Sequence, residues 1–151
     1  MADAAKLGSG GRAVKIEAGP WREVGEVQFG PDGQLVMPDP GQRPGIYRFR
    51  LTRGGARGVY IGESDDMSRR FGQYRNPEPS QRTNVRMNER MRALIATGGI
   101  VEVAVVSEAV LRVAECHELL DLAHRTSRRL VEQHLLDEAR EAGAETVENV
   151  N

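Results

Sequence analysis

Alternating apolar and polar residues predict three β-strands in the central part of the chain, at residues 45–51, 58–62 and 100–106. The runs are short and rich in β-branched and aromatic residues, which is typical of strands. The turn at residues 52–57 is short, so the first two strands should pair antiparallel. Because side chains alternate between the two faces of a strand, a tyrosine from each of these two strands can reach a common point.

Helical patterns follow the strands. Asp65 or Asp66 can cap a helix that runs to about Tyr74, and the proline-containing segment 76–79 ends it. In the next helix Met87 and Leu94 share one apolar side. In total, helices are predicted at residues 65–74, 81–97, 108–122 and 125–142.

The N-terminal part of the chain is less regular. Residues 1–17 show no periodicity and are expected to begin as a disordered tail. Residues 24–37 predict a β-hairpin around the turn Pro31-Asp32-Gly33. We therefore predict an α+β fold, in which a small central antiparallel β-sheet of three core strands is flanked by helices. The tail and β-hairpin extension take residues 1–43, and the main domain takes residues 44–151.

The length of 151 residues suits one domain with a hydrophobic core. No run of about 18 apolar residues predicts a membrane span, and residues 1–12 lack the apolar segment of a secretory signal. The single cysteine, Cys116, fits a reducing cytoplasm, and we expect it to be a small buried residue on a helix. The histidines at positions 117, 124 and 134 are expected on helix surfaces.

Charge is distributed unevenly, although the net charge is only −1. Residues 41–92 contain twelve arginines and five acidic residues, with no lysine. A basic block of this kind suits phosphate groups, and the planar fork of arginine can bind them through two hydrogen bonds. The distribution indicates a nucleic-acid partner, although genome composition can also contribute to the preference for arginine.

Two tripeptides and the helix after them carry the most specific signal in the chain. Gly45-Ile46-Tyr47 is followed by Tyr60-Ile61-Gly62, and then Arg70 and Tyr74 lie four residues apart on one predicted helix face. This order of motifs resembles the GIY-YIG nuclease family, and the resemblance covers about residues 44–151. It implies an α+β nuclease domain that cleaves phosphodiester bonds with a divalent metal ion.

The resemblance also implies roles for these residues. Tyr47 and Tyr60 correspond to the family tyrosines that surround the nucleophilic water, where they would position and deprotonate it. A tyrosine pKa is ordinarily about 10, so nearby arginine and metal would have to lower it. Arg70 corresponds to the arginine that contacts the scissile phosphate, and Tyr74 stands where many members have histidine. Without the resemblance, these would be half-buried strand aromatics and a surface charge.

Glu132 is the candidate metal ligand. It falls on the same side of its predicted helix as Leu135, where a carboxylate is costly unless it is paired or binds a cation. The resemblance implies that Glu132 is the sole protein ligand of Mg²⁺ or Mn²⁺, with waters and substrate phosphate completing the shell. The alternatives are a salt bridge to Arg128 or Arg129, or metal binding by Glu118 or Glu138.

Further residues complete the candidate site. Glu148-Asn149-Val150-Asn151 resembles the family's closing asparagine motif, and Asn149 is preferred over Asn151 because chain ends fray. A polar tail without a role is the alternative. Arginines at four-residue spacing continue the basic block, so we predict nucleic-acid contacts rather than only a solvated face. The candidates for nucleic-acid binding are Arg69, Arg82, Arg86 and Arg90.

These observations predict a cytoplasmic endonuclease that hydrolyses nucleic acid, with DNA as the expected substrate. Glu132 would hold the metal on the leaving oxygen, and Arg70 would stabilise the pentavalent phosphate. One active site cuts one strand, so a homodimer or two sequential events would be needed for a double-strand break. Two other classes remain open, a non-catalytic nucleic-acid-binding module on the same fold and an interaction protein with a basic face.

Overall fold

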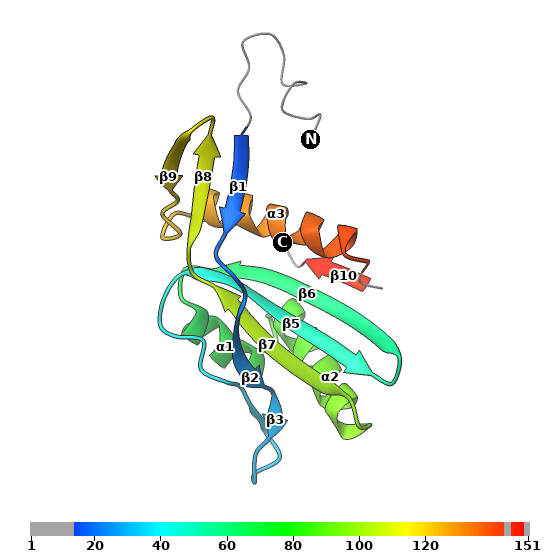
Figure 1. Cartoon of the computed structure of the whole chain (residues 1–151). Helices are drawn as coiled ribbons and strands as arrows, with labels where there is room; N and C mark the ends of the chain where they lie inside the picture. Colours follow the sequence, from blue (N-terminus) through cyan, green and yellow to red (C-terminus); the bar gives the residue numbers. More distant parts are fainter. Residues whose placement is uncertain (1–13, 144–145, 150–151) are drawn as a thin grey trace.

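The computed structural model describes residues 14–143 and the backbone of residues 146–149. Its centre is a five-stranded sheet in the order β10-β6-β5-β7-β2 (Figure 1). Neighbouring strands pair antiparallel, except that β10 runs parallel to β6. Together with three helices in the described residues, this makes an α+β fold, as predicted. The strands span Thr146–Asn149 (β10), Ala56–Ser64 (β6), Gly45–Arg53 (β5), Ile100–Val106 (β7) and Arg22–Glu26 (β2).

The three strands predicted from the alternating pattern form the middle of this sheet. β5 pairs with β6 on one side and with β7 on the other. In the β5–β6 ladder Tyr47 lies opposite Gly62, and Phe49 lies opposite Tyr60. Because side chains alternate along a strand, this register puts Tyr47, Phe49 and Tyr60 on one face and Arg48 on the other.

Two helices cover the face that carries these aromatic residues. α1 (Met67–Arg75) begins after Asp66, whose carboxylate accepts a hydrogen bond of 3.0 Å from the Arg69 amide. A short acidic side chain at this position satisfies an otherwise unpaired helix N–H group. α2 (Arg82–Ala96) packs beside α1. The buried side chains of this core include Met67, Phe71, Tyr74, Met87 and Met91, packed with Tyr47, Phe49 and Tyr60 of the sheet.

α3 (Arg125–Glu141) lies on the opposite face of the sheet (Figure 1). Its apolar side chains Val131 and Leu135 belong to a second buried cluster with Ile46, Ile61 and Val106 of the sheet. The sheet therefore separates two cores, one under α1 and α2 and the other under α3. This separation decides which candidate residues can meet.

The predicted helix over residues 108–122 is wrong. The segment forms β8 (Ala109–Val113) and β9 (Cys116–Leu119), which pair antiparallel, and β8 also pairs with β1 (Val14–Ala18). Ala114 in the intervening turn has φ 55°, a left-handed conformation that interrupts any helix. Strand pairing with β1, far away in the sequence, outweighs the helix propensity of the Glu, Leu and Ala residues here.

Two smaller expectations about this segment are also wrong. Cys116 is exposed on β9 instead of buried on a helix. His117 likewise lies on β9. Residues 14–17, which fall inside the predicted tail, belong to β1, the strand that partners β8.

The N-terminal residues join the main sheet before they form a separate short ladder. β2 is the edge strand beside β7, and it leads into β3 (Gln28–Phe29), which pairs antiparallel with β4 (Leu35–Val36). Gly33 between β3 and β4 has φ +79°, a conformation that favours glycine. Among residues 14–143, no helix has the length and apolar character that crossing a membrane requires.

Candidate active site

Three tyrosine hydroxyls meet inside the molecule. The Tyr74 hydroxyl lies 2.7 Å from the Tyr47 hydroxyl and 3.0 Å from the Tyr60 hydroxyl. Both distances are those of O–H···O hydrogen bonds. The three residues are fully buried, each with 0% exposure. Side chains from β5, β6 and α1 thus form one polar cluster, which we call the tyrosine cluster, inside an otherwise apolar core.

The glycines of the two tripeptides are required by close packing. A Cβ on Gly62 would lie 2.5 Å from the Tyr47 hydroxyl oxygen and 2.6 Å from Tyr47 Cζ. A Cβ on Gly45 would lie 2.6 Å from the Val106 carbonyl oxygen and 2.8 Å from Met67 Cε. Neither space admits a methyl group without movement of the neighbours. Because Gly62 has no side chain, the Tyr47 ring can pack directly against β6. Because Gly45 has none, Met67 at the start of α1 can pack directly against β5.

Aromatic rings surround the tyrosine cluster and hold its members in place. Phe49 stacks on Tyr60 with ring centroids 5.7 Å apart and planes 11° apart. Phe71 meets Tyr47 edge to face at 5.4 Å. Such ring pairs stabilise beyond the area that they bury. The hydroxyl positions are therefore fixed by packed rings as well as by their own hydrogen bonds.

Arg70 links the tyrosine cluster to the surface. Its Nη1 lies 3.4 Å from the Tyr47 hydroxyl, to which it donates a long hydrogen bond, and the residue is half-buried. Arg70 and Tyr74 both reach the cluster from α1, as their four-residue spacing predicts. Arg86, exposed on α2, is close enough to act electrostatically on Tyr60. The positive charges of Arg70 and Arg86 therefore both act on hydroxyls of the tyrosine cluster.

Tyr47 and Tyr60 are neutral at neutral pH. Burial raises the pKa of Tyr47 well above its usual value, and the neighbouring Tyr74 and Tyr60 raise it further. Burial likewise raises the pKa of Tyr60. Arg70 opposes both changes but does not reverse them. The hydroxyls can therefore donate and accept hydrogen bonds here, while removal of a proton from water by a tyrosinate is not favoured.

Asn88 is a site residue that the sequence argument missed. From α2, its amide donates hydrogen bonds to the Tyr74 carbonyl at 2.8 Å and to the Arg75 carbonyl at 3.2 Å. These contacts satisfy carbonyls at the end of α1 and fix the turn that carries Tyr74. The signal was available, because Asn88 interrupts the buried side of α2 between Met87 and Met91.

The structure does not bring Glu132 to the tyrosine cluster. Glu132 is buried, at 4% exposure, as its place among apolar residues predicts. However, its helix α3 packs on the other face of the sheet from Tyr47 and Tyr60. The described residues contain no group of three or more acidic, histidine or cysteine side chains arranged to hold a metal.

A buried ion pair near Glu132 was also missed. Arg128 Nε donates to Glu63 Oε1 at 2.5 Å, and each side chain is 8% exposed. Arg128 Nη1 also donates to the carbonyls of Leu122 and Ala123, at 3.0 and 2.9 Å. Arg128, one of the two arginines predicted as alternatives for pairing with Glu132, thus forms an ion pair with Glu63, directly after the second tripeptide.

The remaining candidates lie around the edges of this region. Asn149 is opposite Ile61 in the parallel β10–β6 ladder, so its backbone lies beside the strand that carries Tyr60. Asn151 lies outside the described residues. Arg69 is exposed and pairs with Asp65 within the same turn. On α2, Arg82 and Arg86 are exposed and Arg90 is half-buried.

Comparisons of the chain with protein-family models, with curated proteins and with solved structures find no match. The function is therefore inferred from the residues themselves and from their geometry.

Proposed function

We propose that this chain is a GIY-YIG-type endonuclease, a metal-dependent enzyme that hydrolyses phosphodiester bonds in nucleic acid, with DNA as the expected substrate. The observation that carries the proposal is the meeting of Tyr47, Tyr60, Tyr74 and Arg70. These residues come from three separate elements and are joined by hydrogen bonds of 2.7, 3.0 and 3.4 Å. They are also the residues that the motif resemblance selects.

Arg70 is the group that would meet the scissile phosphate. Its guanidinium donates to the Tyr47 hydroxyl, and because the residue is only half-buried, it would also be able to meet a phosphate oxygen. Hydrolysis concentrates negative charge on the phosphate in the transition state, and a positioned arginine stabilises that charge. The Tyr47 hydroxyl restricts the guanidinium to one orientation, which lowers the ordering cost of binding.

The fully buried tyrosine cluster would act on the reaction by holding Arg70 in place. Burial raises the pKa of both strand tyrosines, so each keeps its proton at neutral pH. A neutral hydroxyl can accept a hydrogen bond from a guanidinium group but does not accept a proton readily. We therefore assign these tyrosines to the positioning of Arg70 and assign no proton transfer to them.

A divalent ion would supply charge stabilisation at the leaving oxygen. Glu132 offers the hard oxygen donor that Mg²⁺ or Mn²⁺ prefers. In the described arrangement Glu132 does not fit a ligand position at the tyrosine cluster, because α3 lies on the other face of the sheet. The roles given above to Arg70 and the tyrosines do not depend on the metal, and its involvement requires a direct test.

A second candidate function is a nucleic-acid-binding module without catalysis. The full burial of the three tyrosines favours it, as does the separation of Glu132 from them. Such a module would use Arg82, Arg86 and other surface arginines and would leave the tyrosines as core residues.

The test is cleavage of labelled single-stranded, duplex and branched DNA, and of RNA, by purified protein with Mg²⁺ or Mn²⁺. We expect cutting of DNA that EDTA abolishes. Arg70→Ala should sharply lower it too, whereas Arg140→Ala, a change at an exposed arginine on α3, should not. Salt-sensitive binding without cutting of any substrate would establish the binding module instead.

A further inference from the structure

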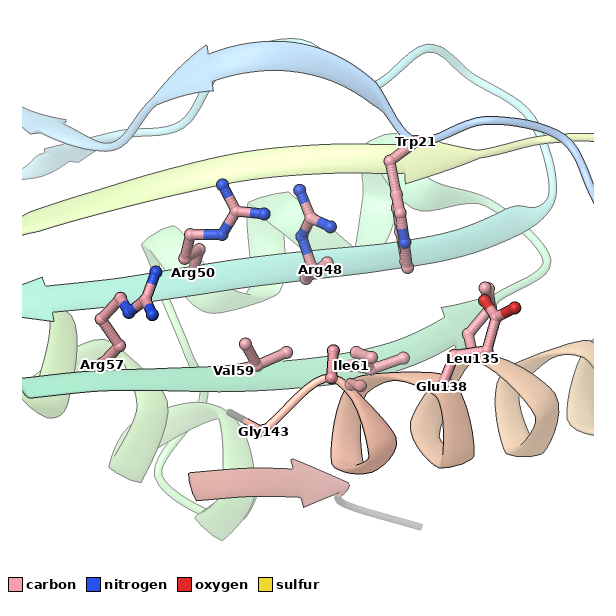
Figure 2. A pocket seen from close by; sticks show the side chains of 11 residues that line it. Trp21, Arg48, Arg50, Arg57, Val59, Ile61, Leu135, Glu138 and Gly143 are labelled. Atoms are coloured by element: carbon pink, nitrogen blue, oxygen red, sulfur yellow. The ribbon is translucent and has the colours of Figure 1, made fainter. Parts of the chain in front are cut away.

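A cavity lies on the α3 face of the sheet, away from the tyrosine cluster. It has a volume of about 420 Å³ and opens between β5, β6 and the C-terminal part of α3. Figure 2 shows Arg48 and Arg50 projecting from β5 and Arg57 from β6 on this face, with Trp21 reaching toward Arg48. Three guanidinium groups and one indole ring thus line a single cavity.

The remaining walls of this cavity are mainly apolar. Val59 and Ile61 of β6 and Leu135 of α3 line it. Glu138 also lines it, and its carboxylate lies 3.4 Å from the Nε2 of His134. Positive side chains therefore outnumber negative ones in the lining, above an apolar floor.

Arg48 carries an unsatisfied hydrogen-bond donor in this wall. The residue is only 9% exposed, and its Nε is buried without a hydrogen-bond partner in the part of the chain that the structure describes. Its Nη2 donates to Glu23 at 3.0 Å, and its Cζ lies 4.6 Å from the centre of the Trp21 ring. A buried donor without an acceptor is costly and rare in folded proteins.

The charges of the cavity also favour an anion. Burial lowers the pKa of Arg48, and the positive charge of Arg50 lowers it further, while the carboxylates of Glu23 and Glu102 offset only part of this change. An anion placed between these two guanidinium groups would remove their repulsion. It would also supply an acceptor for the unpaired Nε of Arg48.

We propose that this cavity binds a small phosphate-bearing molecule with a compact apolar or aromatic part. The phosphate would lie against Arg48 and Arg50, where guanidinium forks bind oxygens through paired hydrogen bonds. The apolar part would contact Val59, Ile61 and Leu135. The volume is in the range of small-ligand pockets. A nucleic-acid backbone is a poorer fit, because Arg48 is too deeply buried for a duplex to reach.

Trp21 allows a direct test because it is the only tryptophan of the chain. Its fluorescence would be followed while phenyl phosphate, inorganic phosphate or benzyl alcohol is added to the full-length protein. We expect a saturable change with phenyl phosphate, binding at least about tenfold weaker with inorganic phosphate, and no saturation with benzyl alcohol. This order of affinities is expected if the cavity recognises both the charge and the apolar surface of the ligand.

Substitution of the arginines that line the cavity tests whether the change in Trp21 fluorescence comes from binding there. Arg50→Gln should weaken binding of phenyl phosphate by about tenfold or more, and Arg57→Gln provides a second variant if Arg50→Gln does not fold. Arg53→Gln changes an exposed arginine at the end of the same strand, outside this cavity, and should bind as the unaltered protein does.

Three results would overturn the proposal. The first is the absence of any saturable change with phenyl phosphate. The second is equal binding of phenyl phosphate and inorganic phosphate, which would exclude recognition of the apolar part. The third is a change of the same size with duplex DNA that Arg50→Gln also removes, which would make this face a nucleic-acid contact.

Discussion

The two faces of the five-stranded sheet hold polar groups inside the molecule in different ways. Under α1 and α2, three tyrosine hydroxyls bond to one another, and the charged group beside them, Arg70, stays half-exposed. Under α3, full charges are buried, with Arg128 and Glu63 each only 8% exposed. Along β5 itself, the aromatic residues Tyr47 and Phe49 alternate with Arg48 and Arg50, so the strand directs aromatic and charged side chains to opposite faces.

The difference follows from the cost of removing each group from water. A hydroxyl is neutral and is satisfied by one or two hydrogen bonds, so three hydroxyls can satisfy one another. A buried charge needs a partner of opposite sign together with further hydrogen bonds. The α1–α2 face therefore suits chemistry at one accessible arginine, and the α3 face depends on its ion pairs for stability.

Removing one partner of the buried ion pair should give the largest effect on stability. Arg128→Met leaves Glu63 as a buried carboxylate without its guanidinium, and we expect a loss of about 3–5 kcal/mol in the free energy of unfolding. Urea denaturation measures it. Arg140→Met, an exposed arginine on the same helix paired with Asp137, should change stability by less than about 1 kcal/mol. Equal losses in the two variants would contradict the difference between buried and exposed pairs.

High pH should destabilise the protein through the tyrosine cluster, which lies on the face of the sheet under α1 and α2. The folded-state pKa of Tyr47 and of Tyr60 is raised above the unfolded value of about 10. Below about pH 10, Tyr47 and Tyr60 keep their hydroxyl protons in the folded and in the unfolded protein. Above about pH 10, the tyrosines of the unfolded chain lose these protons while those of the folded protein still keep them. Stability should therefore fall as pH rises past about 10, by about 1.4 kcal/mol per pH unit for each tyrosine.

Denaturation curves between about pH 9 and pH 11 would test this dependence. Tyr60→Phe removes one of the two titrating groups and should make the fall less steep. A stability that stays constant across this range in the unaltered protein would contradict the burial of these hydroxyls as neutral groups.

Gly62→Ala should destabilise the tyrosine cluster by about 1–3 kcal/mol, because the new methyl group would overlap the Tyr47 ring. Thermal unfolding measures the loss. Gly72→Ala is the matched control on α1, where a Cβ would meet nothing within 4 Å. In a helix that change should stabilise by about 0.5–1 kcal/mol. A loss of stability from Gly72→Ala and none from Gly62→Ala would contradict the close contact between Gly62 and the Tyr47 ring.

The smallest effect is expected at the partly exposed pair of Arg48 and Glu23. The Glu23 side chain is 58% exposed, so solvent screens its attraction to Arg48. Glu23→Gln should lower stability by less than about 1 kcal/mol. Glu26→Gln on the same strand is the control. A loss from Glu23→Gln as large as that from Arg128→Met would mean that exposure does not set the strength of these pairs.

Local signals in the sequence predicted the parts of the site that are close together along the chain. Alternation predicted the pairing of β5 and β6, and a short acidic residue predicted the start of α1 at Asp66. The four-residue spacing placed Arg70 and Tyr74 on one side of α1. Each of these features depends on residues within a few positions of one another.

Features that depend on distant residues were not predictable in the same way. The segment after β7 became a strand because β1, from the other end of the chain, pairs with β8. The burial of Glu132 followed from its helical position, but the face of the sheet that α3 covers did not. The raised pKa of Tyr47 depends on three elements that enclose it together.

The central claim is that Arg70 and the tyrosine cluster form the site of phosphodiester hydrolysis. Single-turnover cleavage of the best DNA substrate, with Arg70→Ala compared against Arg140→Ala, tests it most directly. We predict a fall in the rate on the order of 100-fold or more for Arg70→Ala. Arg140→Ala, a distant exposed arginine, should cut at the unaltered rate. Cutting by folded Arg70→Ala at the rate of the unaltered protein would contradict the claim.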